Sequence, residues 1–345
     1  MDDSVRLGVD VGGTFTDVVL VGPDGVTTAK VPTTTPQHEG VIEGVRAACD
    51  AADVAPADVD RFRHAMTVTT NALLETDGAE TALVTTDGFT DVLEIGRQDR
   101  PNLYDQSVAR PEPLVPADRR YGVDERATVE GIERAVDTDA VRDLAADIDA
   151  EAVAVSLLHA YAHPENERRV AAVLREELDV PVSASHEVLS AFREYERTAT
   201  TVADALVTPA LSTYLGQLVE DAAELGLPEP RVMQSNGGIA AVETVREHAV
   251  TTALSGPAAG VVGASAFEPD DVSGLVTFDM GGTSSDVSLV RDGAVERTTD
   301  ADVGTRPVRV PMVDIETVGA GGGSIAWVDA GGALRVGPQS AGAEP

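Results

Sequence analysis

Short apolar strands separated by glycine-rich turns dominate the hydrophobic pattern of this chain. Two alternating apolar segments flank a Gly-Gly pair at 5–21 (VRLGVDVGGTFTDVVLV), which predicts a strand, a tight turn and a second strand. Residues 36–52 have apolar positions at helical spacing, and 152–161 (AVAVSLLHAY) form a continuous apolar run typical of a buried parallel strand. This order predicts an α/β protein with a mostly parallel sheet and helices on its faces.

The rest of the chain starts with a helical region, which we expect over 191–267. Its first helix, 191–226, is expected to break near Pro209, because proline has no backbone N–H to continue the helical hydrogen bonds. The strand–turn–strand pattern then returns over 274–290. We therefore predict two domains, 1–190 and 191–345.

The two strand–turn–strand segments are copies of one another. Residues 7–21 align with 276–290 at a constant offset of 269, and eight of the fifteen positions are identical. A single repeat at this distance indicates duplicated domains rather than a solenoid. The matched pairs include Asp10 with Asp279, Gly12 with Gly281, Gly13 with Gly282, Thr14 with Thr283 and Asp17 with Asp286.

Each copy of Asp-x-Gly-Gly-Thr has the chemistry of a phosphate loop. The glycines allow a sharp turn in which backbone N–H groups approach phosphate oxygens, and the threonine hydroxyl adds a donor. An aspartate at the C-terminal end of the strand is a suitable ligand for Mg²⁺, held through water. One such motif is as readily a simple hairpin turn, but two with matched strands favour a site that clamps ATP and Mg²⁺ from both sides. The predicted metal ligands are Asp10 and Asp279, and the predicted nucleotide-binding residues are Gly12, Gly13, Thr14, Thr16, Gly281, Gly282, Thr283 and Ser284.

Composition narrows the classes of partner. The 59 acidic residues against 25 basic ones give a formal net charge of −34, which disfavours nucleic acid and anionic lipid as partners. Lys30 is the only lysine, and this acidic, lysine-poor surface is typical of salt-loving microbes. Cys49 is the single cysteine, so no disulfide framework is expected. Without a signal peptide or a long apolar run, the sequence predicts a cytoplasmic protein.

The paired loops resemble the two phosphate motifs of the actin/Hsp70/sugar-kinase superfamily. Other segments are similar to one branch of it, the hydantoinase A/5-oxoprolinase family, and together they cover nearly the whole chain in the right order. The segments that carry this resemblance are HAMTVTTNALLE (64–75), REYERTATTVADALVTPAL (193–211), QSNGG (234–238), ALSGPAAGVVGA (253–264) and TVGAGGGSIA (317–326).

The resemblance implies an actin/hexokinase/Hsp70-like (ribonuclease H-like) fold with duplicated domains. It also implies ATP-dependent ring opening of a cyclic amide such as a hydantoin or 5-oxoproline, in company with a B-type partner chain. For this chemistry His64 is a candidate acid or base, and Arg193 and Arg197 are candidates to stabilise phosphate charge. Turn hydrogen bonds and surface ion pairs are the alternatives for these three residues. Candidates for substrate binding are Asn71, Arg97, Asn236 and Ser255, with helix capping as the alternative for the asparagines and the serine.

Two departures from the family pattern qualify this picture. The family's His-Gly-Thr-Thr is His64-Ala65-Met66-Thr67 here, which changes the polar lining of that turn. The second loop begins near residue 275 and leaves about 70 residues, so we expect the second domain to be incomplete and its missing C-terminal portion to be a partner. The alternative functions are an actin-like sugar or metabolite kinase and a non-enzymatic, ATP-dependent switch protein.

Overall fold

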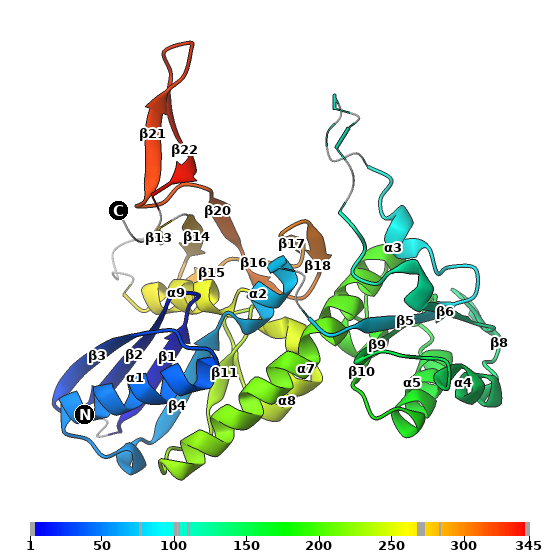
Figure 1. Ribbon diagram of the computed structural model, residues 1–345, viewed down its shortest axis with the longest axis horizontal. Helices are drawn as coiled ribbons and strands as arrows, with labels where there is room; N and C mark the ends of the chain where they lie inside the picture. Colours follow the sequence, from blue (N-terminus) through cyan, green and yellow to red (C-terminus); the bar gives the residue numbers. More distant parts are fainter. Residues whose placement is uncertain are drawn as a thin grey trace.

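The computed structural model describes residues 4–75, 78–99, 102, 104–105, 107–108, 111–267, 273–282 and 284–341. Within these residues the protein is a mixed α/β molecule with two main sheets joined by one long helix (Figure 1). No described helix has both the length and the apolar character needed to span a membrane.

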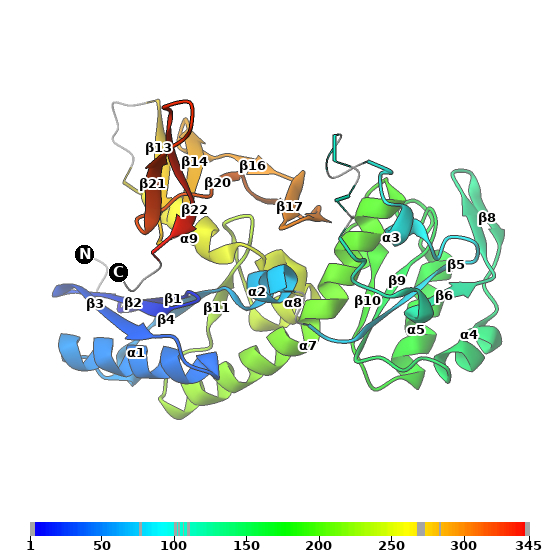
Figure 2. The same ribbon diagram turned by 45° about the horizontal axis from the view of Figure 1, so that its top comes forward.

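The first sheet has the strand order β12-β11-β4-β1-β2-β3. Strands β1, β2 and β3 form an antiparallel meander, and β4 and β11 add to it in parallel on the β1 side. Helix α1 covers one face of the sheet (Figure 2). The elements are β1 (Arg6–Val11), β2 (Phe15–Gly22), β3 (Gly25–Pro32), α1 (Gln37–Ala52), η1 (Pro56–Asp58), β4 (Arg61–Met66), α2 (Val68–Glu75), β11 (Arg231–Met233) and β12 (Ile239–Ala240).

Alternation along β1 separates the core of this sheet from its functional face. Leu7, Val9 and Val11 are at most 4% exposed and belong to the main hydrophobic core. Successive side chains of a strand point to opposite faces, so Asp10 faces away from this core. The same alternation, read from the sequence, therefore accounts for the exposed carboxylate at the end of the strand.

The second sheet, β10-β9-β5-β6, is wholly parallel. All five residues of its β9 strand are buried, as the continuous apolar run at 152–161 predicted. Helices α4 and α5 pack together beside this sheet (Figure 1). Its elements are β5 (Thr81–Thr86), α3 (Val92–Ile95), η2 (Ala117–Arg119), β6 (Arg120–Val123), β7 (Arg126–Thr128), β8 (Gly131–Arg134), α4 (Thr138–Ala145), β9 (Ala152–Ser156), α5 (Glu165–Glu177), β10 (Val182–Ala184) and α6 (Ser185–Val188).

Helix α7 (Glu194–Glu224) runs from the second sheet to the first and packs on both β9 and α1. The predicted break near Pro209 is wrong, because the proline lies inside a continuous helix. A proline in a helix interior costs about 3 kcal/mol. Seventeen residues of α7 are buried, and this packing outweighs the loss of one backbone hydrogen bond.

The C-terminal part of the chain forms smaller sheets beside α9. Strands β13, β14 and β20 pair in antiparallel fashion, and the hairpin β21–β22 projects away from the body (Figure 1). The first sheet takes strands from both sides of the predicted boundary at residue 190, since β11 pairs with β4. The elements are α8 (Val242–Glu247), η3 (Ala249–Thr252), α9 (Ser255–Ser265), β13 (Gly274–Met280), β14 (Ser285–Arg291), β15 (Ala294–Val295), β16 (Arg297–Thr298), β17 (Ala301–Val303), β18 (Arg306–Val308), β19 (Met312–Val313), β20 (Ile315–Val318), β21 (Ser324–Val328) and β22 (Leu334–Ser340).

Candidate functional site

The first glycine loop is a tight hairpin braced by the end of β3. The Gly12 N–H donates to the carbonyl of Phe15 at 2.9 Å. A Cβ at Gly12 would lie 3.1 Å from that same oxygen, so a side chain there would crowd the turn. Thr33 fixes the loop from behind, because its N–H donates to Thr14 O and its hydroxyl to Gly12 O, both at 2.9 Å.

The second glycine loop repeats this geometry. The Gly281 N–H donates to Ser284 O at 2.9 Å, the same bond at the same offset of 269. Behind it lies a glycine-rich segment, in which Gly322 N donates to Gly281 O at 2.9 Å and Gly323 N donates to Gly282 O at 2.8 Å. Thr283, a predicted nucleotide ligand, lies outside the described residues.

The pairing of the strands that flank the two loops is also duplicated. Asp10 of β1 pairs with Asp17 of β2, and Asp279 of β13 pairs with Asp286 of β14. A third strand follows in each half, with β3 pairing with β2 and β20 pairing with β14 in antiparallel fashion. The repeat read from fifteen residues therefore extends to three paired strands in each half, and β15 pairs with β14 as a further strand in the second half.

Helix α9 passes close to both metal-ligand candidates. A Cβ on Gly256 would lie 3.3 Å from Asp10 Oδ1, and one on Gly260 would lie 4.0 Å from Asp279 Oδ2. Residues four apart share one face of a helix, so a single glycine-lined face of α9 contacts both carboxylates. The aspartates that precede the two loops therefore lie near the same face of α9.

The charges around Asp10 fit a divalent cation. Asp10 is an exposed residue of β1, yet partial burial of its carboxyl group raises its pKa, and repulsion from Asp17 and Asp279 raises that pKa further. Lys30 acts in the opposite direction and lowers the pKa of Asp10. Asp10 and Asp279 supply carboxylate oxygens of the kind that Mg²⁺ accepts, and the described residues contain no group of three or more acidic, histidine or cysteine side chains placed to hold a metal ion. Binding a cation there would relieve the repulsion between the carboxylates.

Two other residues predicted to bind nucleotide or substrate instead form hydrogen bonds within the protein. Thr16 is buried and its hydroxyl contacts Thr33 Oγ1 at 3.3 Å, so it does not face the loop's open side. Ser255 is buried and donates to Met66 O at 2.9 Å, which joins the start of α9 to the end of β4.

The two asparagines predicted to bind substrate lie in different parts of the structure. Asn236 accepts from Gly238 N at 2.7 Å within the QSNGG turn. Asn71 lies on α2 and is partly exposed.

His64 lies in the core rather than in the site. It is 1% exposed, and its Nε2 and the Tyr214 hydroxyl form a 2.7 Å hydrogen bond. Burial lowers the pKa of His64 to about 3, so the ring is neutral at physiological pH. His64 pairs with Val9 across the parallel strands, on the face opposite to Asp10. This geometry supports a structural role and argues against the acid or base role expected from the sequence.

The arginine candidates lie at the start of α7, beside the second sheet (Figure 1). Arg197 is 2% exposed and donates to Leu157 O at 2.6 Å, which fixes the end of β9. Desolvation lowers the pKa of Arg197. Arg193 is exposed and stacks on the Phe192 ring, with 5.0 Å between the guanidinium carbon and the ring centroid. The structure does not bring these arginines to the glycine loops.

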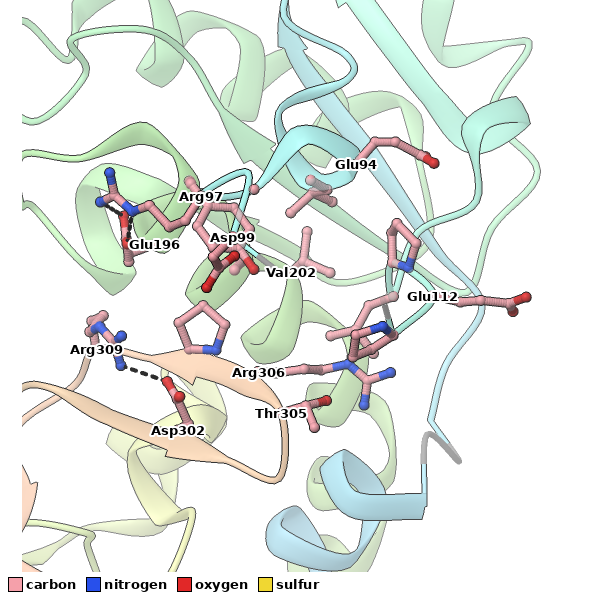
Figure 3. Close-up of a pocket in the computed structure, with 18 residues that line it drawn as sticks. Glu94, Arg97, Asp99, Glu112, Glu196, Val202, Asp302, Thr305, Arg306 and Arg309 are labelled. Carbon is pink, nitrogen blue, oxygen red and sulfur yellow. Dashed lines mark hydrogen bonds and ion pairs between the residues drawn. The ribbon is translucent and has the colours of Figure 1, made fainter. Parts of the chain in front are cut away.

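Arg97 lines a cavity of about 580 Å³ between α3, the first turns of α7 and the β17–β18 hairpin (Figure 3). Its guanidinium donates from Nε and Nη2 to the two carboxylate oxygens of Glu196, each at 2.6 Å. Arg306 and Arg309 line the same cavity, and Arg309 pairs with Asp302 at 3.1 Å. A substrate carboxylate would therefore have to compete with Glu196 for Arg97.

Sequence reasoning missed the two backbone elements that hold the loops in place. The face of α9 formed by Gly256 and Gly260 lies in the ALSGPAAGVVGA segment, where glycine four residues apart in a helix was the available signal. The other element is Gly321–Gly323, where a Cβ at Gly321 would lie 2.5 Å from Gly281 O. Consecutive glycines there indicated a close backbone approach.

Two glycine loops in duplicated strand units, whose aspartates lie against one face of a shared helix, indicate the actin-like class of α/β folds. Comparison with family models agrees. Residues 6–178 match the hydantoinase/oxoprolinase N-terminal region, and residues 197–345 match hydantoinase/oxoprolinase. The chain belongs to the hydantoinase/oxoprolinase family.

Relatives whose names state an activity span several reactions. The chain is 38% identical to the caprolactamase subunit alpha of Pseudomonas jessenii, covering 99% of this chain and 51% of that protein. It is 36% identical to the acetophenone carboxylase gamma subunit of Aromatoleum aromaticum, over 98% of this chain and 50% of that one. It is 34% identical to 5-oxoprolinase 1 of Arabidopsis thaliana, with all of this chain and 30% of that protein covered.

Solved structures give the same result for the fold. The ATP-dependent caprolactamase of Pseudomonas jessenii superposes with a TM-score of 0.89 at 37% identity, over 99% of this chain and 51% of that one. A nucleotide-free acetone carboxylase superposes with a TM-score of 0.82 at 30% identity, over 98% and 51%. The chain thus spans about half the length of these relatives.

Proposed function

We propose that this chain is the ATP-handling part of an enzyme that opens a cyclic amide by hydrolysis. The observation that carries the proposal is the pair of aspartates that precede the two glycine loops. Asp10 and Asp279 lie against one glycine-lined face of α9, near enough for the second to raise the pKa of the first. Membership of the hydantoinase/oxoprolinase family and similarity to caprolactamase and 5-oxoprolinase support a lactam or cyclic imide as the substrate class.

ATP makes this hydrolysis possible because an amide carbonyl is a poor electrophile. The amide oxygen attacks the γ-phosphorus of ATP, and ADP leaves. Water adds to the activated carbon, the ring C–N bond breaks, and a second water releases phosphate from the resulting acyl phosphate. One cyclic amide, one ATP and two waters thus give one open-chain carboxylic acid, ADP and phosphate. The acid is an amino acid from a lactam and an N-carbamoyl amino acid from a hydantoin.

The residues of this chain bind and orient the triphosphate. Backbone N–H groups of Gly13 and Gly282 lie in the two turns, where they are available to phosphate oxygens. Asp10 and Asp279 would hold Mg²⁺, which supplies neutralisation of phosphate charge during transfer. Little covalent chemistry is asked of side chains in such a transfer, which agrees with the absence of His64, Arg193 and Arg197 from the loops.

We include a second polypeptide segment in this proposal, because one face of the sheet formed by β13, β14, β15 and β20 exposes apolar side chains. Leu7, Val9 and Val11 of β1 are 1%, 4% and 0% exposed, whereas their counterparts in β13 are 64%, 59% and 56% exposed. Within the described residues β13 pairs only with β14, although β1 pairs with both β2 and β4. The counterparts are Val276, Phe278 and Met280.

The occupant we assign to this surface is the second half of the family chain, either as a continuation or as a separate polypeptide. This chain covers 51% of the caprolactamase subunit alpha, so that relative has about as many residues again outside the matched region. By analogy with the first half, that segment supplies a strand parallel to β13 and helices that cover Val276, Phe278 and Met280. Burial of three such side chains is worth roughly 1.5–3 kcal/mol each.

Pull-down tests this surface. The probe is the separately expressed second half of the Pseudomonas jessenii caprolactamase subunit alpha, beyond the region matched here. We expect the wild-type chain and a Val26→Asp control to bind it, and Phe278→Asp to lose binding. Val26 is 66% exposed on β3 and lies outside the proposed surface. Failure of the wild-type chain to bind, or self-association of the wild-type chain that Phe278→Asp abolishes, would contradict the assignment.

Activity is tested with the chain, this second half and a B-type chain together in molar KCl, since an acidic, lysine-poor composition is typical of proteins from salt-loving microbes. The names of caprolactamase subunit alpha and acetophenone carboxylase gamma subunit show that those relatives work in assemblies. We expect ADP release stimulated by caprolactam, 5-oxoproline or hydantoin. Stimulation by a sugar panel and by none of the cyclic amides would favour a kinase instead.

A further inference from the structure

Lys30, the only lysine of the chain, lies beside the first glycine loop. Its Nζ is 2.7 Å from both carboxylate oxygens of Asp17 and 4.9 Å from the centroid of the Phe15 ring. Phe15 closes the loop, because its carbonyl accepts the Gly12 N–H. The ammonium group is therefore held over the residue that ends the phosphate loop.

Strand register places Lys30 in one row with the candidate metal ligand. Asp10 pairs with Asp17, and Asp17 pairs with Lys30. Residues paired across neighbouring strands point to the same face, so these three side chains lie side by side on the open face of the sheet. The lowering of the Asp10 pKa by Lys30 agrees with this closeness.

The repeated unit of β13, β14 and β20 has a corresponding row of three paired residues, but none of them carries a positive charge. Asp279 pairs with Asp286, and Asp286 pairs with Thr317. The Thr317 hydroxyl donates to Asp286 Oδ1 at 2.7 Å. Asp286 thus accepts a hydrogen bond from the neighbouring strand, as Asp17 does from Lys30. A hydroxyl therefore suffices to hold this aspartate, and the ammonium of Lys30 adds a charge that the strand pairing does not require.

The choice of lysine is informative in a chain whose other basic residues are all arginine. Arginine presents a planar fork, whereas lysine places a compact charge on a flexible stem and binds phosphate as a point charge. The side chains of Lys30 and Asp17 are 56% and 52% exposed, so water and salt weaken their ion pair. The ammonium is accordingly free to exchange a carboxylate for a phosphate oxygen.

We propose that Lys30 contacts a terminal phosphate oxygen of ATP, and that Asp17 holds its ammonium beside the loop until the nucleotide binds. The inference rests on the proposed function, since it requires the glycine loops to bind ATP. Under this proposal the ammonium group of Lys30 neutralises phosphate charge at the first glycine loop.

Amine acetylation tests this contact directly, because Lys30 and the terminal α-amino group are the only amines of the chain. The reagent is N-hydroxysuccinimidyl acetate, and mass spectrometry of the two peptides gives the two rates. We expect saturating MgATP to slow acetylation of Lys30 several-fold, AMP to have no effect, and the α-amino group to react at an unchanged rate. Equal rates at Lys30 with and without MgATP would overturn the proposal.

Substitution separates this inference from the proposed function. Lys30→Met should weaken ATP binding about ten-fold, the size of a lost charge-assisted hydrogen bond, and leave AMP binding unchanged. Thr28→Met is the matched control, two residues away on the same strand and also exposed. ATP binding by the wild-type chain and equally by Lys30→Met would overturn the role of Lys30 alone. No ATP binding by the wild-type chain would contradict the proposed function as well.

Discussion

Gly256 allows the first turn of α9 to pass directly beside Asp10. A Cβ at this glycine would lie 3.3 Å from Oδ1 of Asp10, closer than ordinary van der Waals contact. One turn further along the helix, a Cβ at Gly260 would lie 4.0 Å from Oδ2 of Asp279, an ordinary contact distance. Helix α9 therefore limits the space around both carboxylates, and it leaves less space beside Asp10 than beside Asp279.

Gly256→Ala should weaken MgATP binding several-fold, because the added methyl group displaces the Asp10 carboxylate by a few tenths of an ångström. Gly260→Ala is the matched control and should bind nearly as the wild type does. Alanine favours a helix over glycine by up to about 1 kcal/mol, so neither variant should unfold at a lower temperature. Titration calorimetry with MgATP and thermal melts give both readouts. Equal loss of affinity in the two variants would contradict the close contact with Asp10.

Asp279→Asn should have opposite effects on stability and on binding. A raised pKa means that the ionised Asp10 carboxylate is disfavoured in the folded state, so its contribution to stability decreases as pH rises above the ordinary value of 3.8. Removing the charge of Asp279 lowers the Asp10 pKa and should stabilise the metal-free chain at pH 7 by up to about 1 kcal/mol. The same change should weaken Mg²⁺-dependent ATP binding.

Urea unfolding without Mg²⁺ and calorimetry with Mg²⁺ check this pair of effects. Asp292→Asn is the control, since Asp292 is exposed in the turn between β14 and β15. A variant at Asp279 that loses stability while it keeps full affinity would refute the assigned role.

His64 should make folding stability depend on pH. Burial lowers its pKa from 6.5 to about 3, so the unfolded chain binds this proton at a higher pH than the folded chain does. The contribution of neutral His64 is complete above pH 6.5 and is lost as pH falls toward 3, at up to about 1.4 kcal/mol per pH unit. His64→Gln should therefore reduce the stability lost between pH 7 and pH 5.

Urea unfolding at the two pH values measures this difference, with His163→Gln as a control on a more exposed histidine. An unchanged pH dependence in His64→Gln would show that the burial described here is not the source of the effect. Loss of ATP binding in a fully stable His64→Gln would restore the catalytic interpretation.

Arg197→Met should lower stability by about 1–3 kcal/mol, because it removes a buried charge-assisted hydrogen bond to Leu157 O and leaves that carbonyl with only the 3.4 Å bond from Ala160 N. MgATP affinity should stay unchanged below the unfolding temperature. Arg193→Met, a change at an exposed position, should alter stability by no more than about 0.5 kcal/mol. Calorimetric melts and ATP titrations of both variants decide between a structural and a catalytic Arg197. A stable Arg197→Met that fails to bind ATP would favour catalysis.

The parts of the site that could be predicted from sequence are those made by local chemistry. The two glycine loops and the aspartates before them are written in contiguous residues, and their repetition at one offset indicated that they act together. Alternation along β1 was enough to place Asp10 opposite the core.

The failures share a different cause, which is packing between distant segments. His64 meets Tyr214 across 150 positions of the chain, and this contact turns a candidate base into a core residue. Burial of α7 likewise overrides the local tendency of Pro209 to break a helix. The first sheet acquires β11 from beyond the predicted domain boundary, because strand pairing ignores sequence distance. No local pattern carries such information.

The central claim is that both loops bind one ATP, and a double-mutant cycle on Asp10→Asn and Asp279→Asn tests it most directly. Titration calorimetry with MgATP in molar KCl should give one ATP per wild-type chain and weaker binding in each single variant. Because both carboxylates would hold the same cation, the double variant should lose much less than the sum of the two single losses. Additive losses, or an Asp279→Asn variant that binds MgATP like the wild type, would contradict the account.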